Sequence, residues 1–487
     1  MTIAVPLKRH LGLAAVAAIV MGNMLGSGVF FTPGELAAVA QHPWQVHFIW
    51  ALSGVITLCG ALTLAELCSR FPQAGASYHI IREGFGPFWG FLLVWVELWV
   101  SGPGAIAGIA IAFGAFMHGI VGPWSGVSPV GWGMAAILFF AAVNLAGVQW
   151  GGRTQVLLTT VKVIGIAALV VGGLLLAAPA ATALSLTPGS DATAATITTT
   201  GAAGGLAGFM RFTGLGIAAV LFTYDGWIDV SHVAGEVRHP QRDFSRGLGM
   251  GVAALTLLYL VVNVAYLRIV PLAAMREAPT AVAATVATAA YGPRGGPLLN
   301  GLMVVSIFGA LGGLVMTLPR LFYTLAVAHG ASAAGLPRRF FGALSMVSPR
   351  TAVPTGAILF TALTSISALA FFGSFSRLVN FFVVPLQLAN ILMVAAIFRL
   401  RKRDGAPPGY RTPGYPLTPL VYMVVMAGFL ISAIVYRPVD TLIGVALAAT
   451  GVPVYRALQK TITTEDDYYR RREDEKTRRR EDERGDE

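Results

Sequence analysis

The segment Gly22–Phe31 reads GNMLGSGVFF and lies inside an apolar stretch long enough to cross a lipid bilayer. Glycine weakens helices and unpaired backbone groups in lipid are costly, so a helix broken here must face protein or a wet cavity. The free N–H groups of Gly26, Ser27 and Gly28 would then suit a carboxylate, because the start of a helix carries partial positive charge. The alternative is that these small residues only allow close packing between helices.

A second segment, Leu221–Asp229, reads LFTYDGWID and places an acid and a glycine inside another apolar stretch. A second broken helix would offer free carbonyl groups, which suit a cation. The carbonyls of Met24, Phe222 and Asp225, with the turn at Gly226, would bind an ammonium group. Together the two breaks predict a site for a zwitterion, whose carboxylate and ammonium lie a few ångströms apart.

Ionisable side chains in the middle of an apolar span cost about 3 kcal/mol on insertion scales and therefore indicate function. Lys162 could hold the end of the first half-helix through its carbonyls, in the place of a sodium ion, or could extend to the membrane surface. The segment Phe308–Met316 supports the first interpretation, since it lacks adjacent hydroxyls that would ligate sodium. For Glu97 we favour a bond to a neighbouring helix over proton transfer, and for Asp225 a helix N-cap over titration. Asp229 could face a substrate side chain or the inner vestibule.

Other chemistries find no support in the sequence. The histidines show no metal-ligand spacing such as HExxH, and there is no Ser/His/Asp set or phosphate-binding glycine loop on a strand. We therefore expect no enzyme activity, no metal and no cofactor. The net charge of +11 indicates orientation in a membrane and not nucleic-acid binding. Cys59 and Cys68 would lie about 13 Å apart on one helix, which is too far for a disulfide.

The elements that must position these residues are predicted to be membrane-spanning helices. Of the 487 residues, 55% are hydrophobic and only 12% are charged, whereas soluble domains carry about 25% charged residues. Each span needs about 20 apolar residues. We predict an all-α integral membrane protein with twelve spans, at residues 12–40, 47–68, 86–117, 130–148, 154–178, 207–235, 246–270, 295–328, 354–373, 376–399, 418–436 and 438–458.

The breaks fall in the first and sixth spans, and broken helices at matching positions are typical of inverted-repeat transporters. The apolar segment Ala281–Tyr291 is too short to span and is predicted as a helix that caps the outer face. We expect a cytoplasmic N-terminus at 1–11, a first repeat of five spans at 12–178, an extracellular loop at 179–206, a second repeat of five spans at 207–400, a cytoplasmic loop with spans eleven and twelve at 401–458, and a charged cytoplasmic tail at 459–487.

The distribution of Lys and Arg predicts how the chain is oriented. With alternating spans, most basic residues between spans fall on the side of the N-terminus. Cytoplasmic loops are rich in these residues, so we expect both termini in the cytoplasm and a multi-pass location in the cell membrane. The few basic residues on the other side are Arg268, Arg276, Arg294, Arg377 and Arg437.

Four segments resemble the amino acid–polyamine–organocation superfamily of amino acid permeases, and its L-type transporter branch in particular. MGNMLGSGVFFTPGELA resembles the first span, Leu64–Phe91 the second span to the third, Phe222–Leu248 the broken sixth span, and Gly409–Leu420 the loop before span eleven. The similarity extends from about residue 12 to residue 458. It implies the LeuT-type fold of five plus five inverted helices, alternating access, and amino acid transport that is commonly sodium-independent and often by exchange.

The resemblance also implies roles for particular residues. The family's glycine-serine-glycine break falls on Gly26–Gly28, its aromatic gate on Phe222 and its lysine of span five on Lys162. We expect an exchanger or facilitator of neutral L-amino acids, embedded in the lipid bilayer. The alternative is a proton-coupled symporter of cationic or polar amino acids that uses Asp229 or Glu97.

The chain departs from the family pattern at several positions. Ile228 stands where many members have asparagine, and Asp229 where the residue is often aromatic or uncharged, so the resemblance does not fix the substrate. Gly102 replaces an arginine that often follows the acid of span three. The loop His118–Pro129 has no cysteine, whereas animal members use one there to join a glycoprotein heavy chain. We expect no disulfide-linked heavy chain.

Overall fold

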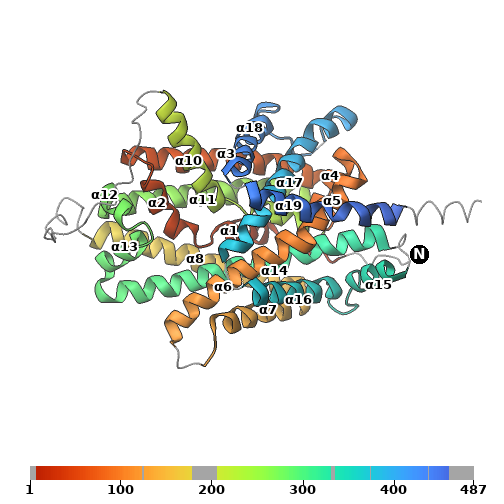
Figure 1. Ribbon diagram of the computed structural model, residues 1–487, viewed down its shortest axis with the longest axis horizontal. Coiled ribbons are helices and arrows are strands. Elements are labelled where there is room, and N and C mark those ends of the chain that lie inside the picture. The colour runs from red at the N-terminus through yellow and green to blue at the C-terminus, as the bar shows by residue number, and fades with distance from the viewer. Residues whose placement is uncertain are drawn as a thin grey trace, which may run out of the picture.

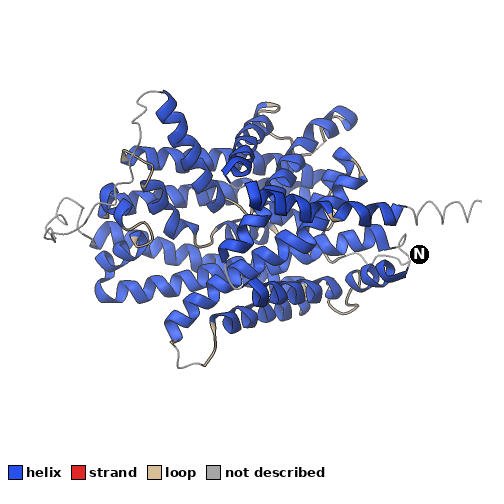
Figure 2. Cartoon of the chain, viewed as in Figure 1, coloured by secondary structure: helices blue, strands red, loops and turns tan. Residues whose placement is uncertain are grey.

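The computed structural model describes residues 7–122, 126–177, 206–330, 335–372, 375–407, 409–436 and 438–459. Within these ranges the backbone is helical almost throughout and forms no β-strand (Figure 2). One isolated parallel bridge joins Leu11 to Val237. The predicted extracellular loop and charged tail lie almost entirely outside the described residues.

The helices of the first half follow the predicted spans closely. They are α1 (Leu13–Met24), α2 (Gly28–Ala37), α3 (Pro43–Arg70), α4 (Ala76–Phe85), α5 (Pro87–Val96), the π-helical η1 (Glu97–Ser101), α6 (Gly102–Val121), α7 (Pro129–Leu145) and α8 (Val148–Leu176).

The second half begins with α10 and the 3₁₀-helix η3, which together replace one long span. Its elements are α10 (Leu206–Thr223), η3 (Trp227–Glu236), α11 (Pro240–Ile269), α12 (Leu272–Glu277), α13 (Val282–Tyr291), η4 (Gly292–Arg294), α14 (Gly295–Gly330), α15 (Gly335–Leu344), α16 (Thr355–Phe372), α17 (Phe375–Asp404), α18 (Leu417–Tyr436) and α19 (Pro438–Ala449).

Eight helical stretches among the described residues are long and apolar enough to cross a membrane. Helices α1 and α2, bent by 45° at their break, would together form a ninth. The predicted spans at 130–148 and 354–373 fall on the shorter apolar helices α7 and α16, and the span at 207–235 falls on α10 and η3. The count of twelve spans stays a prediction.

The broken elements lie in the interior of the helix assembly. Helix α1 packs against α8, α11, α14 and η3, and its side chains Val16, Ile19 and Val20 are fully buried. A helix that is apolar on all sides is expected to be surrounded by other helices in this way. Peripheral helices leave large apolar side chains exposed, among them Leu363 and Val424, which suits contact with lipid.

The two ends of the molecule carry different short helices. Figure 1 shows α12 and α13 beside α2 at one end, and α15 with the N-terminus at the other. The helix predicted at Ala281–Tyr291 is confirmed as α13. Cys59 and Cys68 are both unpaired, as predicted.

Candidate functional site

The predicted break in the first span is confirmed. Helix α1 ends at Met24 and α2 begins at Gly28, and between them the N–H of Gly26 bonds the carbonyl of Met24 at 3.0 Å. Ser27 occupies the N-cap of α2 without a side-chain capping bond. The first N–H groups of a helix have no partner within it, so the start of α2 can donate to an anion.

The second break meets the first. Helix α10 ends at Thr223, and Gly226 has a φ of +100°, which favours glycine. A Cβ at Gly226 would lie 3.1 Å from the backbone of Asn23. The small residues therefore also allow close packing between the two broken helices, in addition to the breaks themselves.

The N-cap predicted for Asp225 is wrong. Gly226 is the N-cap of η3, and Asp225 lies one residue earlier in the turn. The left-handed backbone that starts η3 requires glycine at the cap position. The Asp225 side chain contributes to the cavity wall instead.

Lys162 lies behind the first break, where it was expected. Its fully buried ammonium donates to the carbonyls of Gly22 and Leu25, both at 2.9 Å. The membrane-surface alternative is therefore wrong. The hydroxyl of Ser306 in α14 lies 3.0 and 2.9 Å from the carbonyls of Leu25 and Gly26, and its one hydrogen can be donated to either. A lysine and a hydroxyl together satisfy the carbonyls that the break exposes.

Tyr259 of α11 joins the ends of the two half-helices. Its hydroxyl lies 3.0 Å from the carbonyl of Met24 and 3.4 Å from that of Thr223. The carbonyl of Phe222 accepts the N–H of Asp225 at 3.3 Å. A carbonyl oxygen has two lone pairs, so the Phe222 carbonyl retains acceptor capacity for an ammonium, whereas the Met24 carbonyl already accepts from Gly26 and Tyr259.

A cavity of about 450 Å³ opens where the breaks meet, and its walls come from α2, α6, α10, η3, α14 and α17 among other elements. That volume is in the range of small-molecule sites. Lys162 is not in its wall. All the other predicted site residues line it: Met24, Gly26, Ser27, Gly28, Glu97, Phe222, Asp225, Gly226 and Asp229.

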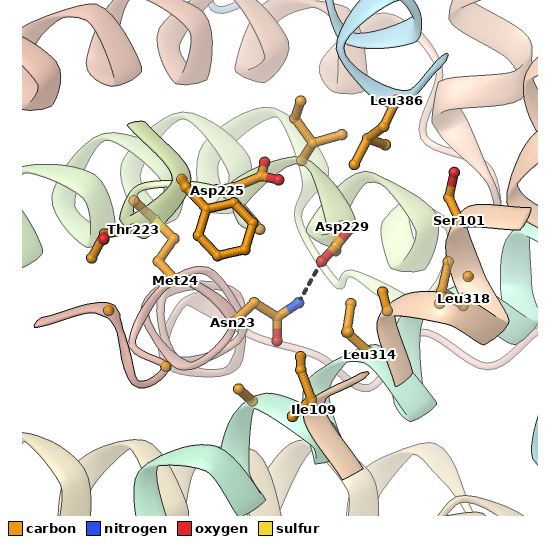
Figure 3. Close-up of a pocket in the computed structure, with 18 of the residues that line it drawn as sticks. Asn23, Met24, Ser101, Ile109, Thr223, Asp225, Asp229, Leu314, Leu318 and Leu386 are labelled. Atoms are coloured by element: carbon orange, nitrogen blue, oxygen red, sulfur yellow. Dashed lines mark hydrogen bonds between the residues drawn. The ribbon is translucent and has the colours of Figure 1, made fainter. Parts of the chain in front are cut away.

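Three carboxylates face this cavity, those of Glu97, Asp225 and Asp229, and none of its described lining residues is Lys or Arg. Asn23 donates its amide to Asp229 at 3.0 Å and so links α1 to η3. Figure 3 shows this bond, with Asp225 and Met24 on one side of Asp229 and Ser101 on the other. The site is therefore acidic and attracts cationic groups.

Glu97 begins the π-helical turn η1, and such turns occur frequently at functional sites. The bond predicted from Glu97 to a neighbouring helix stays a prediction. Among the described residues its carboxylate has no hydrogen-bond or ion-pair partner, although it is only 7% exposed. Because residue 102 is a glycine, the turn that follows Glu97 places no basic side chain at that position beside its carboxylate.

Sequence reasoning missed Asn23, Tyr259 and Ser306. Asn23 was visible as an amide inside the GNMLGSG segment. Ser306 lies two residues before the Phe308–Met316 segment that was noted for lacking hydroxyls. Tyr259 carried no signal, because a tyrosine in an apolar helix does not reveal which backbone carbonyl its hydroxyl reaches.

Comparison with known proteins gives a consistent result. A family model described as amino acid permease matches residues 11–455. The chain is 32% identical over 456 residues to the serine/threonine exchanger SteT of Bacillus subtilis, covering 93% of this chain and 98% of that protein. It is 27% identical over 466 residues to the large neutral amino acids transporter small subunit 2 of Mus musculus, covering 93% and 81%. It is 25% identical over 441 residues to the mouse b(0,+)-type amino acid transporter 1, covering 89% and 84%.

Proposed function

The chain belongs to the amino acid permease family, and from this premise we propose that it exchanges or facilitates neutral L-amino acids across the cell membrane without sodium. The observation that carries the proposal is the meeting of two broken helices around one cavity. We propose the LeuT-type arrangement of twelve spans, with both termini in the cytoplasm, and alternating access to this cavity.

The cavity supports recognition of the amino acid backbone. The α-carboxylate binds the N–H groups at the start of α2, near Ser27 and Gly28, where the helix dipole favours an anion. The ammonium binds the carbonyl of Phe222, near the end of α10, beside the carboxylate of Asp225. The two groups are thus held by opposite ends of broken helices.

Two further residues, Lys162 and Phe222, support the proposed transport. Lys162 supplies a fixed positive charge to the carbonyls of Gly22 and Leu25, so a sodium ion is not needed to hold α1. Phe222 lines the cavity and its side chain is half exposed, which suits a gate that closes over bound substrate.

The cysteines Cys59 and Cys68 both lie within α3, so we propose that the protein works without a disulfide-linked heavy chain.

The relatives support exchange of neutral substrates, since two of them are described as a serine/threonine exchanger and a large neutral amino acids transporter. The second candidate is proton-coupled symport of cationic or polar amino acids. The acidic cavity favours it, because Glu97 and Asp229 would attract a cationic side chain or carry a proton.

Uptake into proteoliposomes tests both candidates. Vesicles are preloaded with single unlabelled amino acids, and uptake of labelled amino acid is measured with sodium or choline outside, and with or without a pH gradient. We expect internal neutral amino acid to accelerate uptake, and neither sodium nor the gradient to change it. Uptake driven by an inward proton gradient into empty vesicles would favour the symporter. Absence of any amino acid uptake would contradict both.

A further inference from the structure

One part of the cavity wall carries polar side chains that backbone recognition does not use. We call it the polar lobe, and it consists of Ser77, Glu97, Ser101, Asp229 and His232. These residues come from α4, η1 and η3, beyond the breaks at which the substrate backbone is proposed to bind. The lobe is therefore placed to meet the substrate's side chain.

Unusual helix geometry brings the lobe together. Side chains three residues apart eclipse on a 3₁₀-helix, so Asp229 and His232 of η3 share one face. The widened π-helical turn η1 begins at Glu97 and ends at Ser101, and both line the cavity. The N–H of Gly75 bonds the carbonyl of His232 at 2.8 Å, which holds the start of α4, with Ser77, against η3.

Three polar atoms of the lobe are buried and have no hydrogen-bond partner in the part of the chain that the structure describes: Oγ of Ser77, Oγ of Ser101 and Nδ1 of His232. The side chains concerned are at most 4% exposed. Buried polar groups in proteins nearly always have a partner. Groups left unpaired at the wall of a cavity therefore point to a ligand atom that completes them.

The lobe is rich in acceptors. Asp229 is held by the amide of Asn23, and Oδ1 of Asn23 is itself buried without a partner. Glu97 adds a second carboxylate, and no lysine or arginine among the described residues lines the cavity. Carboxylates only accept hydrogen bonds when ionised, so the complementary ligand group is a donor.

We infer that the polar lobe receives the end of the substrate's side chain and selects amino acids that carry an N–H or O–H donor there. The inference rests on the proposed amino acid transport. Asn23 acts as a positioning residue, because it fixes the carboxylate of Asp229 towards the lobe. Side chains that end in a carboxylate are rejected, since they would place a third negative charge beside Glu97 and Asp229.

The test compares amino acids of matched shape as competitors for binding to the purified full-length protein. L-Threonine and L-valine differ by a hydroxyl in place of a methyl group, and L-lysine and L-norleucine differ at the end of a longer chain. A site built to bond a donor rejects the analogue that lacks it. We expect at least about tenfold tighter binding of the donor in one pair or both, which one ionic hydrogen bond can supply.

Variants then assign the preference to the lobe. Asp229→Asn keeps the shape and can still accept the Asn23 amide, while Ser101→Ala removes one hydroxyl. Both should lower the donor preference severalfold. Ser367→Ala removes the hydroxyl of an exposed serine that does not line the cavity, so it serves as the matched control for Ser101→Ala and should keep the preference. Thermal unfolding of each variant verifies the fold.

The outcomes separate the two proposals. Equal binding within both pairs, with amino acids still bound, would overturn the polar lobe and leave transport standing. An unchanged donor preference in folded Asp229→Asn and Ser101→Ala proteins would also overturn it. Failure of the protein to bind any amino acid would instead contradict the proposed function.

Discussion

Gly26 and Gly28 flank Ser27 in one break, but their surroundings differ. A Cβ at Gly26 would meet no atom within 4 Å, whereas a Cβ at Gly28 would lie 2.5 Å from Oγ1 of Thr223. Gly26 also lines the cavity, so an added methyl group there would occupy ligand space. We therefore expect Gly26 to matter for ligand binding alone, and Gly28 also for the contact between α2 and α10.

This difference predicts opposite phenotypes for two alanine substitutions. Gly28→Ala should lower the thermal unfolding temperature, since overpacking costs about 1–3 kcal/mol. Gly26→Ala should leave unfolding nearly unchanged and weaken amino acid binding. Thermal unfolding and binding are measured on the same purified samples. Thr223→Ala added to Gly28→Ala should restore stability, and a Gly28→Ala protein as stable as the parent would contradict the assignment.

Lys162→Ala should reduce turnover more than it reduces the amount of protein in the membrane. The change leaves the carbonyl of Gly22 without its ammonium donor, and a hydrogen bond to a charged group contributes about 1.5–3 kcal/mol. We expect about a tenfold or greater loss of uptake per molecule. Ser306→Ala is the milder comparison, because the Leu25 carbonyl then keeps its bond to Lys162. Normal turnover in the Lys162→Ala protein would contradict the role of the lysine in holding α1.

For single residues, the sequence identified as site residues those whose side chains are unusual in a membrane span. Gly26, Lys162 and Asp229 are conspicuous there, and nearly all such residues lie at the cavity or behind the break. Ser306 and Tyr259 are ordinary residues of apolar helices. Their importance arises only because packing brings their hydroxyls to particular carbonyls, and one-dimensional patterns do not contain that pairing.

Prediction of the helical elements was limited in a similar way. The break between α1 and α2 follows from glycines next to polar residues, and the sequence predicted it. The π-helical turn at Glu97 and the 3₁₀-helix from Trp227 to Glu236 were not predicted. They change the helix period by a fraction of a residue per turn, which hydropathy over a span does not resolve. These local changes nevertheless decide which side chains form the polar lobe.

Element η3 is also tied to α14 by a buried ion pair. Arg320 donates to Glu236 at 2.9 Å, and both side chains are at most 1% exposed. Breaking a buried pair by removing one partner typically costs about 3–5 kcal/mol, while replacing both by apolar residues is often neutral. Glu236→Leu alone should therefore destabilise the protein strongly, and Arg320→Met with Glu236→Leu should recover most of the loss. Thermal unfolding of the single and double variants measures both effects.

The double variant separates stability from transport. If η3 and α14 must part at this pair during alternating access, the stable double variant will transport at a changed rate. Equal destabilisation by the single and double variants would show that packing around these side chains, and not the uncompensated charge, dominates.

At the scale of the whole molecule, backbone bonds tie the described N-terminal segment to the end of η3. His10 and Leu11 donate backbone bonds to the carbonyl of Glu236, both at 2.9 Å, and Arg238 returns one to Leu11 at 2.8 Å. Arg9 also contacts the carbonyl of Pro72 at 3.3 Å. The N-terminal segment thus lies across the chain that follows η3, next to the buried pair of Glu236 and Arg320. An opening of the cavity towards this end requires that the segment and η3 move.

The orientation of the two ends is the last prediction. Both natural cysteines are unpaired, so Cys59→Ala and Cys68→Ala give a background for single introduced cysteines. Arg294→Cys introduces a cysteine on η4 beside α13, and Arg338→Cys introduces one on α15 near the N-terminal end (Figure 1). Both positions are exposed. In intact cells a membrane-impermeant maleimide should label position 294 and leave position 338 unlabelled.

Permeabilised cells supply the control, since both positions should then react and show that each cysteine is accessible. Labelling of position 338 in intact cells, with position 294 protected, would invert the topology and contradict the positive-inside assignment. The N-terminal segment would then lie on the extracellular side. The labelling pattern therefore decides which side of the membrane the segment around Leu11 faces, and with it the side on which this segment and η3 must move for the cavity to open there.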